Sequence, residues 1–517
     1  HFALPKTFLD ATRLVFVPRA IDGATPMLVQ MTYLPALGLG GEPALTLWAM
    51  VSGWVAGGLL FTACRRHLGT TWSLAVTLVF LSVPAVIFGA GTGQVEVRIA
   101  MFTMIAAISV SLALKTGLLR FAAVAGLAVG FFIGAKYTGL LFAAACGLVI
   151  LFQRRWLAHG AVLTAVAVIV GCPWYAWNGW HTGDPVFPML YSWLNGLVDY
   201  RFWDQTHADY LKSAFFESEL ELPLTPLGFI YYPIQATFGN LPGDGLGRTG
   251  FGIFAALITP FAVLGLWRKR AGVLESELFP AAMIIFLFFA LWYFTGSSQR
   301  IRHLVPIFPI LIICLSTAAE RAAAELTLYR PVTAVFAVSI LIQLAGFGLY
   351  STNYLQRLIR GESRQVFLEQ NIAGTSAVPW INRNLTDRDR LFVETRQILY
   401  LLRVPTFLGH PIYQNQIDLA PKTADLEKFM RQLKELGITH ALTRGGNLIS
   451  KTFFEALVKQ GCARPIKRFE SKGIHSRALT RAGVEETGLH IFQVLEFNWN
   501  GCDKVRVGPT LPSTPSK

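Results

Sequence analysis

A lysine stands in the middle of the almost wholly apolar stretch Phe121–Phe152. An ionisable side chain inside a membrane costs roughly 2.5–3.5 kcal/mol on insertion scales unless it finds a partner or water. Lys136 is therefore either a ligand for an anionic oxygen such as a phosphate, or a lysine whose chain extends to the membrane surface. Gly134 and Gly139 allow close approach of a ligand, and Tyr137 adds a ring for substrate contact, which together favour the ligand.

Two arginines form a second candidate site between two apolar runs. Arg300 and Arg302 lie in the segment Ser297–His303, SSQRIRH. A guanidinium group can form two parallel hydrogen bonds with phosphate oxygens, so this pair suits a phosphate ligand. The alternatives are an anchor to lipid head groups and ion pairs with the acidic segment 177–250. We favour phosphate binding and add the neighbouring His303 as a candidate substrate ligand.

Glu96 is the acidic candidate. It follows the glycine-rich sequence GAGTGQV and opens an apolar run near Arg98. A carboxylate here has the chemistry of a general base or of a ligand for a divalent cation. An ion pair with Arg98, or a negative charge at a helix N-terminus, explains it equally well. The sequence alone leaves these alternatives open.

Two more polar residues follow the aromatic-rich segment GCPWYAWNGW, His181 and Asp184. Gly183-Asp184-Pro185 is a good turn sequence by itself, which favours a structural role for both. Asp184 is retained as a candidate substrate ligand. The sequence contains no phosphate-binding P-loop, no HExxH and no GxSxG motif.

The elements that position these residues are membrane-spanning helices. Of the 517 residues 53% are hydrophobic and only 15% are charged, and the mean hydropathy is +0.47, which excludes an ordinary soluble protein. Phe121–Phe152 would form one helix about 48 Å long, beyond a hydrocarbon core of about 30 Å, so we expect two short helices that meet near Lys136. With the other apolar runs this gives about ten spans. Those runs fall near residues 44–64, 72–89, 98–114, 158–176, 251–267, 277–294, 303–319 and 331–350.

The distribution of short basic loops decides how the chain crosses the membrane. If Phe121–Phe152 crosses twice, all five loops lie on one side, the cytoplasm; if it crosses once, the first two lie opposite the other three. The first arrangement is favoured. The outer face then receives the candidate residues above, an amphipathic segment at 1–43, and the long loop 177–250, which carries eight acidic and three basic residues. The five basic loops are Arg65–His67, Lys115–Arg120, Arg154–Arg155, Arg268–Arg270 and Arg321–Arg330.

After the transmembrane region 1–350 the composition becomes that of a water-soluble protein, and we expect a small α/β domain on the outer face over 351–505. A helix is predicted at Ala424–Leu436, and a disordered tail at 506–517. From residue 351 onwards there are 24 Lys and Arg and 15 Asp and Glu, so +9 of the formal +14 lies here. A scattered solvated surface is favoured over a basic face turned to anionic lipids. The predicted strands are Arg390–Glu394, Ile438–Leu442, Arg464–Phe469 and Leu489–Leu495.

The six cysteines are scattered and include no CxxC pair. Four of them lie in apolar runs, where a buried free thiol is the ordinary expectation. The sequence therefore predicts neither a metal site nor a disulfide framework.

Five segments, taken in order, resemble the polytopic glycosyltransferases of the GT-C superfamily: HFALPKTFL, GQVEV, GLAVGFFIGAKYTG, PWYAWNGWHTGDPVFP and QRIRHLVPIFPIL. The likeness is greatest to bacterial sugar transferases of the lipopolysaccharide core, and more distant to aminoarabinose transferases and protein O-mannosyltransferases. It covers roughly residues 1–350. The fold class it implies is a mainly α-helical polytopic membrane protein with a C-terminal soluble α/β domain.

The resemblance implies transfer of a sugar, with inversion, from a polyprenyl-phosphate donor to a lipid, glycan or protein acceptor. The reaction takes place on the outer face of the bacterial cytoplasmic membrane. Lys136, Arg300 and Arg302 match positions expected to hold the donor phosphate, and Glu96 matches a second acidic position. In the family, an aspartate upstream of the first motif acts as the base or binds a divalent metal ion. Here that motif begins at His1, so the aspartate would precede His1, and we expect His1 to mark a truncation. His1 itself is a candidate substrate ligand.

Two other functions are weighed against this one. A transporter or flippase for a lipid-linked or anionic solute would use the same cations without chemistry, but the sequence shows no convincing inverted repeat. A catalytically silent relative would lack the upstream aspartate. The soluble outer domain favours the enzyme, and no nucleic acid partner is implied.

Overall fold

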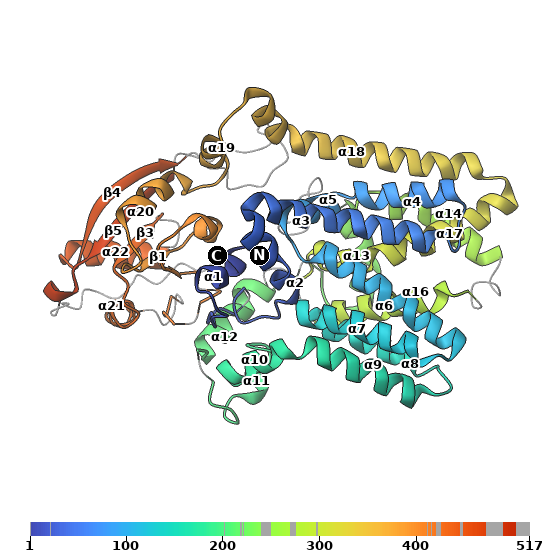
Figure 1. The fold of residues 1–517 in the computed structure, drawn as a ribbon, viewed down its shortest axis with the longest axis horizontal. Helices are drawn as coiled ribbons and strands as arrows, with labels where there is room; N and C mark the ends of the chain where they lie inside the picture. The colour runs from blue at the N-terminus through green and yellow to red at the C-terminus, as the bar shows by residue number, and fades with distance from the viewer. Residues whose placement is uncertain are drawn as a thin grey trace.

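The computed structural model has two parts, a bundle of long helices and a smaller C-terminal domain built on a sheet (Figure 1). The bundle helices run roughly side by side, and the sheet lies beyond one of their ends. The candidate ligand His1 and the expected tail 506–517 lie outside the described residues. The structure describes residues 2–20, 22–200, 202–217, 220, 222–238, 250–268, 276–295, 298–410, 412–414, 416–419, 425–444, 448–471 and 490–502.

The bundle contains the apolar segments expected from the sequence. Among the described residues, four helices are long and apolar enough to cross a membrane, and two bent pairs pass the same test together, α4 with α5 and α9 with α10. These pairs bend by 64° and 56°, just before Pro84 and Pro173, because a proline cannot continue the hydrogen bonding of the preceding helix. When the four shorter apolar helices are added to these long helices and bent pairs, each span expected from the sequence corresponds to one helix or one bent pair. The bundle elements are α1 (Ala3–Asp10), α2 (Leu28–Met31), α3 (Tyr33–Cys64), α4 (Thr70–Ser82), α5 (Pro84–Thr92), α6 (Glu96–Thr116), α7 (Leu119–Ala135), α8 (Thr138–Ile150), α9 (Trp156–Gly171), α10 (Pro173–Thr182), α14 (Phe254–Arg268), α16 (Leu278–Phe294), η3 (Ile301–Ile307), α17 (Phe308–Leu326) and α18 (Tyr329–Arg360).

The stretch around Lys136 forms the predicted helical hairpin. Helix α7 ends at Ala135, Lys136 is extended, and α8 begins at Thr138. At the far end of α8 the Gln153 side-chain amide donates a hydrogen bond to the Ala113 carbonyl of α6 at 2.6 Å. Since the turn lies beside the opposite end of α6, at Glu96, the two helices run out and back along α6.

Small residues let the hairpin pack closely against α9. A Cβ atom at Gly126 would lie 2.5 Å from the Leu163 carbonyl oxygen, and one at Gly130 would lie 2.7 Å from that of Ala167. Such close approach of helix backbones is typical of membrane interiors, where packing replaces the hydrophobic effect as the driving force. The sequence AVAGLAVG therefore fixes α7 against α9 and so fixes where the hairpin turn lies.

Two of the five predicted cytoplasmic loops, Arg65–His67 and Lys115–Arg120, meet at one end of the bundle. Glu277, which precedes α16, forms ion pairs with Arg66 at 2.7 Å and with Lys115 at 2.6 Å. Arg66 follows α3, Lys115 lies in the last turn of α6, and Glu277 precedes α16. The structure thus places the basic loops after α3 and α6 together, at the end of α6 opposite Glu96.

The long outer loop contains short helices. They are α11 (Tyr191–Leu194), α12 (Gln205–Leu211), the π-helix η1 (Lys212–Phe216) and α13 (Pro226–Phe238). Phe187, Tyr191 and Trp203 of this loop pack with Ala20 and Ala24 of the N-terminal segment in one buried cluster. The loop is therefore folded against the N-terminal segment and the hairpin turn at Tyr137.

The C-terminal region is a small α/β domain, as predicted. Its five strands pair in the order β2-β1-β3-β5-β4, with β2-β1-β3 parallel and β5 antiparallel to both β3 and β4. Four strands match the predicted ones; β2, between Pro405 and Gly409, was not predicted. Two buried clusters cover the faces of the sheet. The elements are α19 (Arg364–Asn371), α20 (Val378–Asn384), β1 (Leu391–Val393), η5 (Arg396–Leu401), β2 (Thr406–Leu408), α21 (Leu426–Glu435), β3 (His440–Thr443), α22 (Leu448–Lys459), β4 (Ala463–Ser471) and β5 (His490–Phe497).

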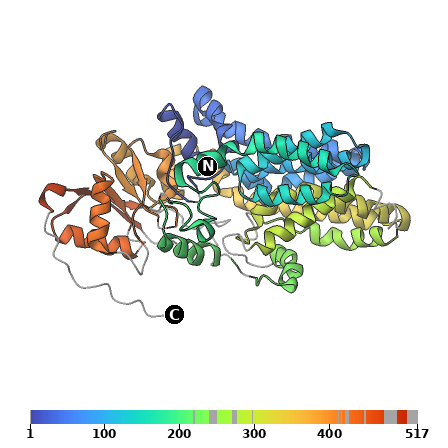
Figure 2. The ribbon, with the colours of Figure 1, turned by 90° about the horizontal axis from the view of Figure 1, so that it is seen from below.

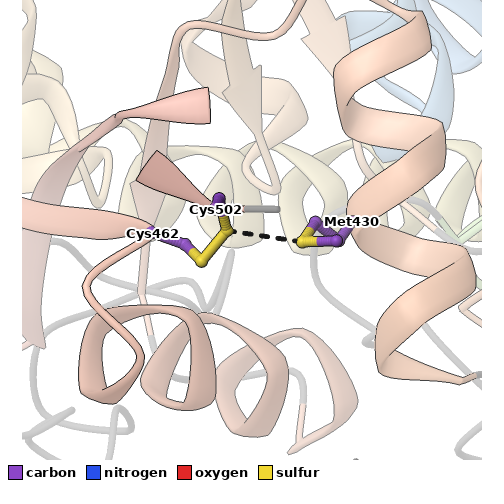
Figure 3. Close-up of a disulfide and its surroundings, with 3 residues drawn as sticks. All are labelled: Met430, Cys462 and Cys502. Atoms are coloured by element: carbon purple, nitrogen blue, oxygen red, sulfur yellow. Dashed lines mark hydrogen bonds between the residues drawn. A yellow bond between two sulfur atoms is a disulfide. The ribbon is translucent and has the colours of Figure 1, made fainter. Parts of the chain in front are cut away.

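A disulfide joins Cys462 to Cys502, which the sequence, predicting no disulfide framework, did not anticipate (Figure 3). Strands β4 and β5 pair antiparallel, with Ala463 opposite Phe497, and the Asn498 amide donates to the Cys462 carbonyl at 2.9 Å. This pairing brings two cysteines 40 residues apart to a Cα–Cα distance of 5.2 Å. The sequence could not show it, because the partners meet only through the sheet register. The other four cysteines are free, as expected.

The N-terminal segment joins the two parts of the molecule. Figure 2 shows the N-terminal helices and the outer loop between the bundle and the sheet domain. The Ala20 amide donates to the Tyr413 carbonyl at 2.7 Å, and Lys6 Nζ donates to the Leu402 carbonyl at 3.1 Å. The C-terminal domain therefore lies at the same end of the bundle as Glu96 and Lys136.

Candidate functional site

Glu96 and Lys136 form an ion pair at the outer-loop end of α6. Lys136 Nζ lies 2.9 Å from Glu96 Oε1, and the two side chains are 25% and 5% exposed. The pair forms because α6 begins at Glu96 and α7 ends just before Lys136, and these helices pack side by side. Of the alternatives left open for Glu96, the pairing with Arg98 is not the one found.

Arg98 and Tyr33 instead fix the turn that presents Glu96. Arg98 donates hydrogen bonds to the carbonyls of Gln94 and, at 2.9 Å, of Ala49, and its guanidinium lies over the Tyr33 ring, 5.1 Å from the centroid. The Tyr33 hydroxyl donates to the Gly93 carbonyl at 2.8 Å. Both residues are buried, and sequence reasoning missed both roles, since each acts on backbone carbonyls distant in sequence.

The Arg300–His303 segment lies against the same end of α6. Arg302 and His303 lie within electrostatic range of Glu96, and Arg300 and Arg302 lie within range of Lys136. The structure thus brings together five candidates that the sequence places in three separate segments. With one acidic group among these residues, the site carries an excess of positive charge.

Several buried polar atoms at this site have no hydrogen-bond partner among the described residues. They are Glu96 Oε2, Arg302 Nε, His303 Nδ1 and Ser298 Oγ. Buried polar groups in proteins are nearly always hydrogen-bonded, so a cluster of unpaired ones indicates a place for a polar ligand. Together with the excess positive charge, the arrangement suits an anion that offers several oxygen acceptors.

Tyr137 follows Lys136, but its hydroxyl is engaged within the protein. The hydroxyl oxygen lies 3.0 Å from the Phe187 carbonyl and 3.2 Å from that of Ala24, and it accepts a hydrogen bond from Asn178 at 2.9 Å. Tyr137 therefore links the hairpin turn to the N-terminal segment and to the outer loop. Its assignment as a substrate ligand stays a prediction.

Asp184 organises the start of the outer loop. Its carboxylate accepts hydrogen bonds from the Val186 amide at 2.8 Å, the Tyr200 hydroxyl at 2.9 Å and the Leu190 amide at 3.3 Å. Burial raises the pKa of this carboxyl above its ordinary value, and the three donors oppose that rise. His181 stacks on Phe16 at 4.4 Å between ring centroids. All these contacts hold the loop in place, and substrate binding by Asp184 stays a prediction.

The described residues do not fit a divalent metal ion at Glu96, one of the alternatives that the sequence left open. No group of three or more His, Cys, Asp or Glu that could hold a metal ion occurs within the described part of the chain. Glu96 is surrounded by Lys136, Arg302 and His303 rather than by further acidic ligands. A site for Mg²⁺ or Ca²⁺ needs several oxygen ligands, so no step of the mechanism below passes through a metal.

No protein-family model matches this chain, and no curated protein is similar to it in sequence. Among solved structures it is similar to ArnT from Cupriavidus metallidurans in the apo state, with a TM-score of 0.52 and 13% identity, covering 98% of this chain and 94% of that chain. It is also similar to an apo oligosaccharyltransferase from Archaeoglobus fulgidus, with a TM-score of 0.50 and 12% identity, covering 93% of this chain and 70% of that chain. At such identities the likeness shows the fold: the chain has the GT-C fold of a polytopic membrane protein, as its motifs predicted.

Proposed function

We propose that this protein is a membrane glycosyltransferase that moves a sugar from a polyprenyl-phosphate donor to a lipid, glycan or protein acceptor, with inversion at the anomeric carbon. One observation carries the proposal: the ion pair between Glu96 and Lys136 lies beside Arg302 and His303, with unpaired polar atoms on three of these four residues. The GT-C fold agrees with it. The similar protein from Archaeoglobus fulgidus is named as an oligosaccharyltransferase.

The cations act on the leaving group. An acceptor hydroxyl attacks the anomeric carbon, the bond from that carbon to the phosphate oxygen breaks, and its electrons leave with the phosphate. Lys136 and Arg302, assisted by Arg300, bind the phosphate and stabilise the negative charge that grows on it. Removing one preorganised donor of this kind typically costs about 100- to 1,000-fold in rate.

Glu96 acts on the acceptor. Its Oε1 is held by Lys136, whereas Oε2 has no hydrogen-bond partner among the described residues and is available to take the proton of the attacking hydroxyl. The turn fixed by Arg98 and Tyr33 keeps the carboxylate in place during the reaction. Within one ion pair, Glu96 thus removes the proton and Lys136 stabilises the phosphate.

The site and the C-terminal domain face the outside of the cytoplasmic membrane in this proposal. The basic loops after α3 and α6 gather at the opposite end of the bundle, which the positive-inside rule assigns to the cytoplasm. The Cys462–Cys502 disulfide in the C-terminal domain supports the same orientation, because disulfides persist in oxidising compartments.

The test compares Lys136→Ala and Arg302→Ala with Lys115→Ala. Lys115 lies at the opposite end of α6 and is exposed, so it is a matched lysine control. Purified protein is incubated with polyprenyl-phosphate-linked sugars and an acceptor extract, and release of polyprenyl phosphate is measured. We expect release by the wild type and by Lys115→Ala, and a loss of at least about 100-fold in the other two. Near-wild-type release by both site variants, or movement of the lipid-linked sugar across the membrane without release, would refute the proposal.

A further inference from the structure

We propose that Gln299 and Tyr232 are positioning residues that hold the Arg300–His303 segment against the Glu96–Lys136 pair, an inference that rests on the proposed function. Gln299 directly precedes this segment and is 2% exposed. Tyr232 belongs to α13, in the outer loop, and is also buried. Both act on the backbone that leads into the phosphate site.

The Gln299 side chain forms a two-point hydrogen bond with the outer loop. Its Nε2 donates to the Leu222 carbonyl at 2.8 Å, and its Oε1 accepts from the Leu222 amide at 3.0 Å. The pairing reproduces the exchange that two β-strands make and fixes both the position and the orientation of the carboxamide. A buried carboxamide satisfied at both ends is costly to displace, because either partner left alone loses its hydrogen bond.

Tyr232 adds a third hydrogen bond to the same residue. Its hydroxyl donates to the Gln299 main-chain carbonyl at 2.8 Å. The ring is held by α16, since its centroid lies 5.4 Å from that of Trp292 and 5.8 Å from that of Tyr293. Helix α13 is fixed to α16 a turn earlier, where the Phe229 ring stacks on Phe289 at 4.6 Å. The outer loop thus presents a rigidly placed donor to the start of the cationic segment.

The tether matters because two side chains of the segment, those of Arg302 and His303, keep polar atoms unpaired within the described part of the chain. Arg302 Nε and His303 Nδ1 have no hydrogen-bond partner among the described residues. Side chains kept open for a ligand cannot hold their backbone in place, so the backbone must be fixed from outside the site. Gln299 does this from the N-terminal side, before the segment enters η3 at Ile301.

Tyr293 provides a matched control. Its hydroxyl donates to the Pro223 carbonyl at 2.8 Å, one residue beyond the Leu222 contact, and so ties the same loop to α16 without touching the cationic segment. Tyr232→Phe and Tyr293→Phe each remove one buried hydroxyl and one hydrogen bond of equal length. A general loosening of the outer loop would affect the two variants alike, whereas loss of the tether affects only the first.

The experiment measures binding of farnesyl phosphate to the full-length protein in detergent, with farnesol as the phosphate-free probe, and the donor KM and kcat where transfer is detected. We expect about tenfold weaker binding for Gln299→Ala, about fivefold for Tyr232→Phe, and a change within about twofold for Tyr293→Phe. We also expect the donor KM to rise more than kcat falls. Thermal unfolding identifies variants that fail to fold, and Tyr232→Phe tests the tether if Gln299→Ala is among them.

The outcomes separate this inference from the proposed function. If Arg302→Ala weakens binding of farnesyl phosphate but Gln299→Ala and Tyr232→Phe bind as the wild type does, the tether is wrong and the phosphate site stands. Equal weakening by Tyr232→Phe and Tyr293→Phe would also overturn the tether. If Arg302→Ala itself binds as the wild type does, the phosphate site is wrong.

Discussion

Replacing Lys136 with methionine isolates the contribution of the ion pair to stability. Methionine keeps much of the apolar chain but removes the ammonium group, which leaves the Glu96 carboxylate, 5% exposed, without its partner at 2.9 Å. Removing one partner of a buried pair costs about 3–5 kcal/mol, because the remaining charge stays buried and uncompensated. Lys136 is one-quarter exposed and Arg302 still acts on Glu96, so we expect the lower end, about 3 kcal/mol.

The double variant Lys136→Met/Glu96→Gln distinguishes loss of the pair from loss of packing. It removes both charges of the pair at nearly constant volume, so the buried Glu96 carboxylate no longer remains without its partner, and about 2 kcal/mol should be regained. The assay is denaturant unfolding of the purified protein in detergent for the wild type, both single variants and the double variant. The matched control is Lys115→Met with Glu277→Gln at the other end of α6, where Lys115 is 62% exposed and the pair should be worth at most about 1 kcal/mol.

Two results would refute this reasoning. If Lys136→Met unfolds at the same denaturant concentration as the wild type, the buried Glu96 carboxylate is not stabilised by Lys136. A double variant as unstable as Lys136→Met would mean that the loss comes from packing of the lysine chain rather than from the unpaired carboxylate. Transfer should be lost in both variants whatever their stability, since each lacks the phosphate ligand.

Two further predictions concern parts of the molecule away from the site. The free energy of unfolding of the Cys462→Ser/Cys502→Ser variant should be about 4 kcal/mol lower than that of the wild type, because the disulfide closes a loop of 40 residues in the unfolded chain. Denaturant unfolding with and without reductant measures it, and a difference below about 1 kcal/mol contradicts the prediction. The hydrogen bond from Lys115 lowers the pKa of Glu277 below its ordinary value of 4.5. The stability that Glu277 contributes should therefore be fully present above pH 4.5 and disappear as the pH falls through the lowered pKa. Melting temperatures of the wild type and Glu277→Gln from pH 3 to 7 should converge at the acid end, and a constant difference would show that ionisation of Glu277 plays no part.

The architecture around Lys136 could be predicted because two independent signals agree. An apolar stretch too long for one span, with a lysine at its centre, required a break, and the count of basic loops required two crossings. Neither signal depends on contacts between distant residues. The same holds for four of the five strands, whereas β2, confined between Pro405 and Gly409, was not predicted.

The pairings within the site could not be predicted in the same way. Glu96 and Lys136 are 40 residues apart, and Arg98 lies closer in sequence to Glu96 but faces Ala49 and Tyr33 instead. Gln299 carries no sequence signal at all, since its partners are the backbone of Leu222 and the hydroxyl of Tyr232. A side chain that serves distant backbone is found only once the fold brings the two segments together.

The most direct test of the central claim is a structure of the protein with a polyprenyl-phosphate-linked sugar bound. The proposed site predicts phosphate oxygens within hydrogen-bond distance of Lys136 Nζ and of the Arg302 guanidinium, with Glu96 Oε2 facing the anomeric position. A phosphate bound elsewhere, for example at Arg66 and Lys115 at the opposite end of α6, would contradict it.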